Sequence, residues 1–497
     1  NKVRGHNTGE FTVDHALVTA RMTMSDYDNA WAVVDGCLFV QPLSRFAPPD
    51  QAPVQPNLIF EAAPKPAGLK VVDDPTEAAS LLDGSADIGV YALSESTTRG
   101  ARTVGLGVST GKETFYVARQ EAMDAVASTL SGRPISGHDA KETELALRSL
   151  GGGKREWAFS TFLAAYLLGA GSRDPRLEDL AKEFLDVTLI STEQLLGTGR
   201  AARKVADVSV NEAAEFAARR AEAILNLRPR LEAEMQNLGV DYLFHEIELP
   251  LAGVLADMES EGVAIDVAYL KDMQEELASQ LAAIESEVEQ VAGQKFNLSA
   301  PQQLAKVLFE DLRLPVGKRT KTGYSTDADT LEGLREKHPI IGLILEHRQL
   351  SKLKSTYVDA LPQIVDPISG RVHTSFGQAS TATGRLASSN PNLMNIPIRT
   401  ELGQRIRRAF KAGRPDHVMV SADYSQIEPR ITTPLSWDPK LVGALSARPG
   451  LTSAHVAAVF KMPLQQRRPK LRRYHTGPDL ASTYATGIAG RYRSRWS

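Results

Sequence analysis

The chain has 497 residues, with 57 Lys and Arg against 60 Asp and Glu, so its formal net charge is −3. At roughly 100 to 200 residues per domain, this length predicts two to four domains. Apolar residues make up 42% and charged residues 24%, which excludes a disordered or fibrous chain. The single cysteine, Cys37, excludes an intramolecular disulfide and favours a reducing compartment.

Nothing in the sequence predicts membrane attachment or secretion. The longest apolar runs, such as 162–168, fall far short of the roughly 20 residues that a membrane-spanning helix needs. No basic and then apolar leader opens the chain, so we expect a cytoplasmic protein, and we take it to be a monomer. The first residue is Asn1 and not methionine, which predicts a fragment of a longer protein.

The near-neutral total charge hides two strongly basic segments. Residues 397–414 carry six Lys and Arg against Glu401 alone. Residues 461–497 carry nine Lys and Arg against one acid, Asp479. Basic segments on a neutral chain predict that one face meets a polyanion. The alternative is a solvated basic surface without a partner.

The first part of the chain divides at a proline-rich connector. Residues 1–56 show little sustained periodicity, and six prolines lie between positions 48 and 66. We therefore expect 1–56 to be the end of a preceding domain and a linker. Residues 57–240 mix strand and helix patterns, which predicts an α+β domain.

Three elements stand out within this mixed region. Two short β-prone runs flank Thr110-Gly111-Lys112, which predicts a hairpin. An apolar segment over 158–168, ended by Gly169, predicts a buried helix. An Ala-, Glu- and Arg-rich segment predicts a second helix over 210–227.

A long helix is the clearest local prediction. Seven apolar residues from Leu270 to Val291 follow one another at spacings of 3, 4, 4, 3, 4 and 3, which is one face of an α-helix. Asp266 is placed to cap its start and Gly293 to end it. A polar, basic loop is expected around residues 318–323.

A candidate metal ligand follows a short apolar run. Residues 418–422 are apolar or small and lead directly to Asp423. A carboxylate at a strand end is well placed to hold Mg²⁺, which binds one or two carboxylates together with substrate phosphates. We therefore predict a strand over 418–422 and a metal ligand at Asp423. The alternative is that Asp423 caps the helix that follows.

Three motifs surround this site in a fixed order. They are Thr383-Gly384-Arg385, Pro391-Asn392-Leu393-Met394-Asn395-Ile396-Pro397 and Asp423-Tyr424-Ser425-Gln426-Ile427-Glu428. This series resembles the first polymerase motifs of the family A DNA polymerases, the bacterial DNA polymerase I type. Upstream, the segments similar to the family's thumb and thumb–palm junction are 296–304, 320–326 and 347–357. The resemblance covers 245–430 closely and 57–240 loosely.

The resemblance implies an α+β multidomain fold, in which an RNase H-like 3′–5′ exonuclease-type domain precedes a right-hand polymerase domain with thumb, palm and fingers. It implies primer–template DNA and dNTPs as partners and Mg²⁺ as the cofactor. Asp423 would be the catalytic metal ligand, and Glu428 would exclude a ribose 2′-hydroxyl. The residues that would line the nucleotide pocket are Tyr424, Ser425, Gln426, Ile427, Glu428, Arg472 and Tyr484.

The resemblance also implies a DNA-binding set. Arg385 would reach the minor groove at the primer end, and Asn392 and Asn395 would contact the duplex, although Met394 stands where a polar residue is usual. A polymerase must hold any sequence, so phosphate and minor-groove contacts suit it better than major-groove readout. The cations expected at phosphates are Lys318, Arg319, Lys321, Arg348, Lys352, Lys354 and Arg399. The alternative for each is solubilising surface charge.

The exonuclease-type region departs from its family pattern. Two-metal hydrolysis needs several carboxylates around ions about 3.5 to 4 Å apart. No Asp-x-Glu motif occurs between Gly89 and Glu95, and Thr143 stands where the next Asp is expected. Phe216 and Arg220 stand where a Tyr and an Asp belong. A cation in place of a metal ligand predicts a scaffold without proofreading activity.

The C-terminal part departs as well. After residue 430 there is no Glu, and the acids are Asp438 and Asp479. The family's second catalytic carboxylate is expected beyond residue 497, so we predict a chain truncated within its fingers and palm. Thr476 stands where a phosphate-binding Lys is expected, and Pro478 interrupts the fingers helix at a cost of about 3 kcal/mol. One palm carboxylate is poorly suited to hold two ions.

Two functions remain open from the sequence. The first is a DNA-directed DNA polymerase, a nucleotidyltransferase of replication and repair, and the second is a polymerase-derived fragment that binds primer–template without turnover. A 3′–5′ exonuclease is disfavoured by the missing carboxylates. The expected division is 1–56 as tail and linker, 57–240 as an inactive exonuclease-like domain, and 241–497 as the polymerase domain. Within the last, we expect the thumb over about 245–365, a partial palm over about 366–430 and degraded fingers over 431–497.

Overall fold

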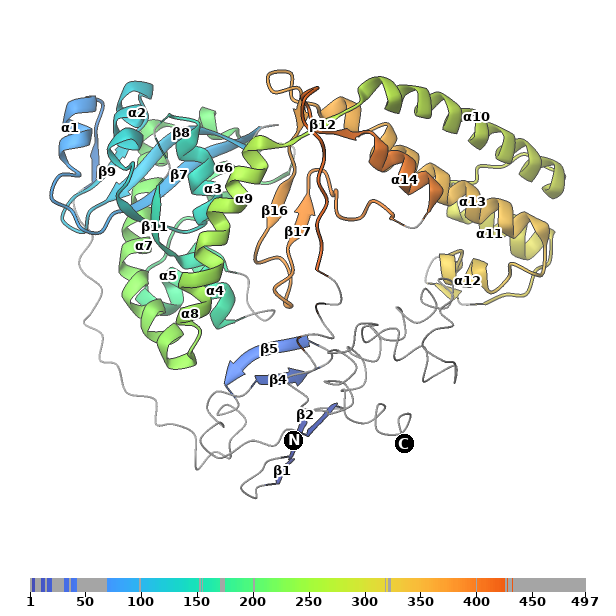
Figure 1. Ribbon diagram of the computed structural model, residues 1–497, viewed down its shortest axis with the longest axis horizontal. Coiled ribbons are helices and arrows are strands. Elements are labelled where there is room, and N and C mark those ends of the chain that lie inside the picture. Colours follow the sequence, from blue (N-terminus) through green and yellow to red (C-terminus); the bar gives the residue numbers. More distant parts are fainter. Residues whose placement is uncertain are drawn as a thin grey trace.

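The computed structural model describes residues 69–424 with short gaps at 98–99, 152, 154, 170–174, 200–201, 318, 321–322 and 399, together with residues 427 and 431. It also describes the backbone of short strands within residues 2–42. The described chain forms a sheet with helices on its faces, which we call the sheet body (69–261), and an elongated projection of helices, which we call the arm (267–353) (Figure 1).

The sheet body is built on a six-stranded sheet in the order β11-β10-β7-β8-β9-β6. The strands are β6 (Leu69–Val71), β7 (Gly89–Thr97), β8 (Gly100–Ser109), β9 (Thr114–Val117), β10 (Pro134–Gly137) and β11 (Glu156–Ser160). Strands β7, β8 and β9 are antiparallel, whereas β10 runs parallel to both of its neighbours. The predicted hairpin is confirmed as the β8–β9 turn, where the amide of Thr110 donates to the carbonyl of Glu113 over 2.9 Å.

Helices cover this sheet. They are α1 (Pro75–Ser80), α2 (Gln120–Thr129), α3 (Ala140–Arg148), α4 (Thr161–Leu168), α5 (Leu177–Leu185), α6 (Thr192–Leu196) and α7 (Val210–Leu238). The predicted helix from 210 is confirmed and extends to Leu238, with Ser209 and Glu212 forming its capping box. The helix predicted over 158–168 begins later, at Thr161, because residues 158–160 belong to β11 and the Ser160 side chain caps the helix.

Helix α7 lies very close to the sheet, because glycines face it there. A Cβ at Gly107 would lie 2.1 Å from the carbonyl oxygen of Ala217, and one at Gly89 would lie 2.4 Å from that of Ala221. Backbone cannot give way to such contacts, so both positions need glycine for steric reasons. The mixed sheet with a helix packed on it bears out the predicted α+β fold of this region.

A helical segment connects the sheet body to the arm. Helix α8 (Asp241–Leu243) and the π-helical turn η6 (Phe244–Glu248) lead into α9 (Leu249–Glu261), which packs against α3. The next strand, β12 (Val263–Ile265), pairs with β15 (Arg371–Val372) and β18 (Phe410–Lys411). A small sheet therefore gathers segments that are far apart in the sequence at the base of the arm.

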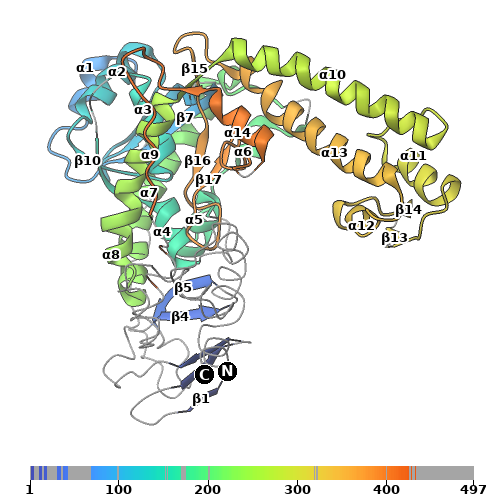
Figure 2. The ribbon, with the colours of Figure 1, turned by 45° about the vertical axis from the view of Figure 1, so that its right-hand side comes forward.

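The arm consists of two long helices and a tip. Helix α10 (Val267–Ala292) confirms the predicted long helix, including the cap at Asp266, whose side chain accepts from the amide of Tyr269, and the end at Gly293. It lies beside α13 (Pro339–Leu353), and both project away from the sheet body (Figure 2). The tip contains α11 (Pro301–Lys306), η7 (Val307–Asp311), the β13–β14 pair (Arg319–Thr320 and Gly323–Tyr324) and α12 (Ala328–Glu332).

A hairpin lies between the sheet body and the arm (Figure 1). The chain returns from α13 through η8 (Lys354–Val358) and η9 (Leu361–Ile364), and then forms the antiparallel pair β16 (Ser375–Gly377) and β17 (Ala387–Ser389). Helix α14 (Glu401–Arg408) follows and packs at the base of the arm. The first two predicted motifs, 383–385 and 391–397, lie on this hairpin and on the segment after it.

One sequence prediction is wrong at the level of secondary structure. Residues 418–422 form no strand, and Val418 and Val420 are 81% and 83% exposed. An apolar strand is stable only when other strands cover its edges and a core covers its face, and no strand of the described residues pairs with this segment. The assignment of 1–56 to the end of a preceding domain and a linker stays a prediction, and the described backbone there contains strands, among them Glu10–Val13, where polar and apolar residues alternate.

Of the helices that the structure describes, none combines the length and the apolar character needed to cross a membrane.

Candidate nucleic-acid interface

Arg385 lies at the end of a tight turn between β16 and β17. Its side chain is exposed, and its carbonyl oxygen accepts a hydrogen bond of 2.7 Å from the Thr381 hydroxyl. Gly384, immediately before it, has a φ of +74°, which residues with a Cβ rarely adopt. The hairpin and the glycine together fix the backbone position from which the Arg385 side chain extends.

The segment that carries Asn392 and Asn395 is held by buried hydroxyl groups. Thr374 and Ser388 lie within 2.8 Å of each other, oxygen to oxygen, and both bond to the carbonyl of Pro391. The Asn392 side chain accepts from the amide of Asn395 over 3.1 Å, so its carboxamide oxygen closes a local turn. Both asparagines are exposed, and their contact with a duplex stays a prediction.

The basic segment 397–414 turns out to use several of its cations internally. Arg405 forms a bidentate pair with Glu276 of α10, at 2.8 and 2.5 Å, which raises the pKa of the guanidinium. Arg407 donates to the carbonyl of Ile396, and Lys411 pairs with Asp266 over 2.6 Å. The surplus of positive charge in this segment therefore serves partly to anchor α14 and β18 to the base of the arm.

Gly403 allows α14 to cross the segment before it. A Cβ at this position would lie 2.2 Å from the carbonyl oxygen of Pro397, which is a backbone atom. The close crossing fixes Ile396, which is 5% exposed, in the core at the base of the arm. Met394 and Ile398 on either side are 56% and 68% exposed.

The cations predicted on α13 and at the start of η8 have different environments. The Arg348 guanidinium donates to both oxygens of Thr326, and burial lowers its pKa. Arg348 thus ties the end of the tip loop to α13. Lys354 pairs with Asp359 at 2.8 and 2.9 Å, whereas Lys352 is exposed. Phosphate binding by these three residues stays a prediction.

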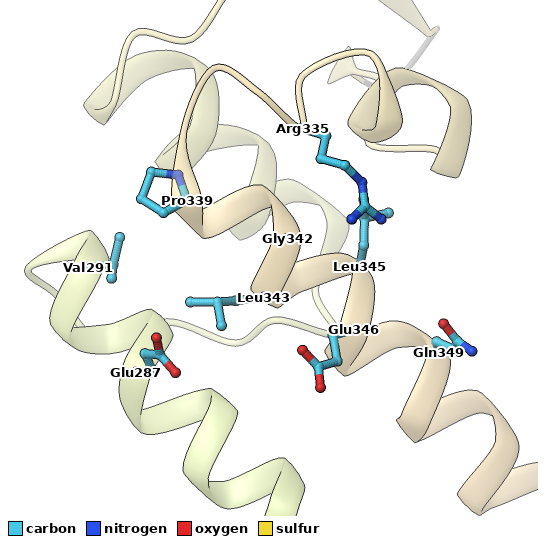
Figure 3. A pocket seen from close by; sticks show the side chains of 9 residues that line it. All are labelled: Glu287, Val291, Arg335, Pro339, Gly342, Leu343, Leu345, Glu346 and Gln349. Carbon is cyan, nitrogen blue, oxygen red and sulfur yellow. The ribbon is translucent and has the colours of Figure 1, made fainter. Parts of the chain in front are cut away.

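The two long helices of the arm carry opposite charge. Helix α10 contains six acids against one cation, Lys271, whereas α13 carries Arg348 and Lys352 against Glu346. A pocket of about 560 Å³ lies between them, where Glu287 of α10 and Glu346 of α13 flank the groove on neighbouring helices (Figure 3). Arg335 at its rim pairs with Glu332 over 2.8 Å. The two carboxylates at this pocket repel a phosphate group.

The nucleotide site is described only in part. Asp423 and Tyr424 are exposed on a segment without regular secondary structure, with Tyr424 80% exposed, and Ile427 is 38% exposed. Within 69–424, no three His, Cys, Asp or Glu side chains gather into a metal site. One carboxylate with nucleotide phosphates and waters is a donor set that Mg²⁺ accepts, but it does not hold two ions. The predicted residues whose side chains lie outside the described part are Ser425, Gln426, Glu428, Arg472, Tyr484, Lys318, Arg319, Lys321 and Arg399.

The exonuclease-type region places a buried cation where the resemblance expects a metal ligand. Arg220 on α7 is 2% exposed, and its guanidinium carbon lies 3.4 Å from the centre of the Phe216 ring and 5.4 Å from that of Tyr91. It bonds to the Glu178 carboxylate and to the carbonyl of Ile190. The Arg220–Glu178 pair is hydrogen-bonded within the fold, and position 220 offers a guanidinium where a metal would need a carboxylate.

Neighbouring titratable groups are shifted by the same environment. Burial, aided by the charge of Arg220, lowers the pKa of His138 to about 3, so the ring is neutral at physiological pH. Burial, aided by the charge of Glu142, raises the pKa of Asp139 to about 6, and its carboxylate caps α3 by accepting from the amide of Glu142. Thr143 is buried one turn further along α3.

Comparison with known proteins gives the lineage. The family model described as DNA polymerase family A matches residues 267–477, and that for the ribonuclease H-like domain of DNA polymerase I matches residues 91–227. A solved structure of the POL domain of Pol1 from M. smegmatis, in complex with DNA primer-template and dNTP, is 35% identical with a TM-score of 0.71. The match covers 83% of this chain and 71% of that one. The chain belongs to DNA polymerase family A.

Relatives of this family A chain include DNA polymerase I from Bacillus subtilis, which is 42% identical over 352 residues. The thermostable DNA polymerase I from Thermus aquaticus is 42% identical over 365 residues. These matches cover 71% and 72% of this chain but 40% and 42% of the relatives. The chain therefore matches about two fifths of the length of these relatives.

Sequence reasoning about this family A chain missed residues that hold the interface in place. Tyr166, Thr374 and Ser388 bond to the hairpin and its neighbouring segment, and Glu259 bonds to the amide of Phe376. Thr374 and Ser388 flank the predicted motifs closely enough to be suspected from the sequence. Tyr166 is 215 residues from its partner Thr381, and no local pattern connects the two.

Proposed function

We propose that this chain acts as a DNA-directed DNA polymerase, which adds dNTPs to a primer 3′-hydroxyl as the template directs, in cytoplasmic DNA replication and repair. The observation that carries the proposal is its likeness, at 35% identity and a TM-score of 0.71, to a polymerase domain solved with DNA primer-template and dNTP. In the reaction the 3′-oxygen forms a bond to the α-phosphorus of the dNTP. The bond from that phosphorus to the pyrophosphate breaks, and pyrophosphate leaves.

The proposed nucleotide site centres on Asp423. Its exposed carboxylate would hold Mg²⁺ together with the nucleotide's phosphates, and the ion would neutralise charge on them. Tyr424 and Ile427 would line the pocket beside the base and sugar. We assign Ser425, Gln426, Arg472 and Tyr484 to the same pocket, and Glu428 to the exclusion of a ribose, on the family resemblance alone.

The proposed DNA site runs from the hairpin to the arm. Arg385 would donate to a minor-groove acceptor at the primer end, where every base pair offers one, so that binding does not depend on sequence. Lys352 and the tip cations Lys318, Arg319 and Lys321 would contact phosphates. The acidic face of α10 supports this orientation, because phosphates avoid it and approach the α13 side.

We propose that the exonuclease-like domain, residues 57–240, is a scaffold without hydrolytic activity. The buried Arg220–Glu178 pair supports this assignment, because a fixed guanidinium repels the divalent cations that hydrolysis needs. The polymerase domain then begins near 241, with the arm as its thumb. We take the working unit to be a monomer.

A second candidate is a DNA-binding chain without turnover. The observation that favours it is that segment 418–424 is exposed and has no regular secondary structure. No strand or helix then fixes the position of the Asp423 carboxylate. Catalysis needs its groups fixed closely in the productive position, whereas phosphate binding tolerates loose groups.

Primer extension separates these candidates. The purified chain and an Asp423→Ala variant, prepared in parallel to control for host polymerase, are given a 5′-labelled primer–template, Mg²⁺ and all four dNTPs. We expect extension by the parent and none by the variant. Binding of the same labelled DNA, measured by fluorescence anisotropy, should be equal for both.

Each outcome has a defined meaning. Binding without extension by either protein would establish the second candidate and refute turnover by this chain. Equal extension by both would show contamination or remove Asp423 from the site. Absence of DNA binding in both would refute the proposed function altogether.

A further inference from the structure

The sheet body contacts the hairpin at three successive points. The Glu259 carboxylate of α9 accepts from the amide of Phe376 on β16. The Gln378 carboxamide, just after β16, donates to the carbonyl and the carboxylate of Glu248, at 2.6 Å each. The Tyr166 hydroxyl of α4 donates to the carbonyl of Thr381 over 2.7 Å. These contacts follow the hairpin toward the Arg385 turn.

The first contact continues into the sheet body as a buried ion pair. Glu259 is 5% exposed and pairs with Lys141 of α3 over 2.8 Å. The backbone carbonyl of the same residue lies 2.7 Å from Nδ1 of His373, just before β16. The start of the hairpin is therefore fixed to α3 through α9, and motion between the two halves is restrained at this end.

The third contact reaches the turn itself. The Tyr166 hydroxyl donates to the carbonyl of Thr381, and the Thr381 hydroxyl in turn donates to the carbonyl of Arg385 over 2.7 Å. One buried hydroxyl thus holds the residue whose side chain closes the turn onto Arg385. Tyr166 is 6% exposed, and burial, aided by the charge of Glu248, raises the pKa of its hydroxyl, so it remains a donor at physiological pH.

We propose that Tyr166 is a positioning residue for primer-end binding: the exonuclease-like half fixes the 381–384 turn from which Arg385 reaches the DNA. The inference rests on the proposed function, in which Arg385 contacts the primer end. It gives a half without metal-binding carboxylates a role in the polymerase reaction. The hydroxyl orders the turn before DNA arrives, so binding does not bear the entropic cost of ordering it.

The test is a double-mutant cycle on the full chain. Tyr166→Phe removes the hydroxyl and keeps the ring, Arg385→Ala removes the guanidinium, and the third variant carries both changes. Affinity for a labelled primer–template is measured by fluorescence anisotropy without nucleotide. Loss of a hydrogen bond worth about 1 kcal/mol predicts an affinity about fivefold weaker for Tyr166→Phe. The double variant should bind no more weakly than Arg385→Ala alone, because an unfixed turn without its arginine has nothing further to lose.

Tyr116→Phe is the matched control. Tyr116 lies on β9 of the same half, is 1% exposed and packs against Gly105 of β8. It takes no part in the three contacts between the sheet body and the β16–β17 hairpin. Its variant should bind DNA as the parent does. Hydrogen–deuterium exchange without DNA should speed up over 381–386 in Tyr166→Phe and stay unchanged in Tyr116→Phe.

The possible failures are distinguishable. If Arg385→Ala binds as tightly as the parent, the assigned role of Arg385 is wrong, and the positioning inference falls with it. If Arg385→Ala binds more weakly while Tyr166→Phe binds as the parent does, the positioning inference alone is overturned. The same holds if the two losses multiply in the double variant, because independent effects would mean that Tyr166 does not act through Arg385.

Discussion

Arg220 in the sheet body and Arg385 at the hairpin represent two uses of the same side chain. Arg220 is 2% exposed, lies over the Phe216 ring and is bound by Glu178, so its charge is neutralised inside the fold. Arg385 is exposed at the end of a turn that other residues hold in place. The first arginine is buried and must be paired for the domain to fold, whereas the second lies at the surface, where we propose that it contacts DNA.

The same contrast extends to other titratable groups of the two halves. In the sheet body, His138 and Asp139 have pKa values moved to about 3 and about 6 by burial. In the polymerase half, the acidic α10 and the basic side of α13 separate charge along the surface. In this family A chain the sheet body thus keeps its architecture while its charges serve packing, and the polymerase half carries the charged residues for which we propose contact with DNA.

The largest expected effect concerns the interior cation. Arg220→Ala leaves Glu178 without its partner and removes the contact with Phe216, so we expect unfolding to become easier by about 3 to 5 kcal/mol. Urea unfolding followed by tryptophan fluorescence measures this change, since Trp157 lies on β11 of the six-stranded sheet on which α7 packs. Arg219→Ala is the adjacent control. Its side chain is more exposed than that of Arg220, at 27%, and its pair with Glu215 is half exposed, so its effect should be smaller than that of Arg220→Ala. Equal losses for the two variants would remove the distinction between the halves.

A smaller loss of stability is expected in the polymerase half, where the backbone of α14 at Gly403 contacts the backbone of Pro397. Gly403→Ala places a Cβ against the carbonyl of Pro397, so α14 and residues 396–398 must separate, at a cost of about 1 to 3 kcal/mol. Gly342→Ala on α13 is the control, because no heavy atom lies within 4 Å of the added Cβ. There the better helix former should stabilise the protein by about 0.5 to 1 kcal/mol. Thermal unfolding of both variants checks the signs, and a stable Gly403→Ala protein would refute the close crossing.

The smallest effect is pH-dependent and belongs to the sheet body. Burial raises the pKa of Asp139 from 3.8 to about 6. Ionisation of Asp139 therefore lowers the free energy of unfolding. The full loss is present above pH 6, and the free energy of unfolding recovers as the pH falls toward 3.8. Asp139→Asn keeps a capping oxygen and should stabilise the protein by about 1 to 2 kcal/mol at pH 7.5, a gain that shrinks steadily below pH 6. Urea unfolding at a series of pH values measures it.

Asp74→Asn is the matched change at an exposed helix cap, where the side chain of Asp74 accepts from the amide of Glu77. A gain of equal size at both caps would show that burial is not the cause of the effect at Asp139.

Local signals in the sequence were sufficient for several elements. The apolar spacing, Asp266 and Gly293 predicted α10 with its correct ends, because the periodicity of its apolar face and the caps at its ends are local features of the sequence. The β8–β9 hairpin followed from its turn for the same reason. The start of α4 was misplaced because residues 158–159 are equally apolar in a buried strand and in a buried helix. The strand over 418–422 was predicted from its own composition, whereas a strand also requires partners.

The sequence by itself determined the family, the order of its motifs and the residue types that suit phosphates and a divalent cation, because these depend on side-chain chemistry along the chain. Tertiary structure alone decided which cations are available to a partner: Arg405, Arg407 and Lys354 are bound internally, and Arg348 holds the tip loop. It also decided that Tyr166 bonds to Thr381 in the turn before Arg385. Such contacts join residues far apart in the sequence, and their energies depend on distance and burial, which linear spacing does not encode.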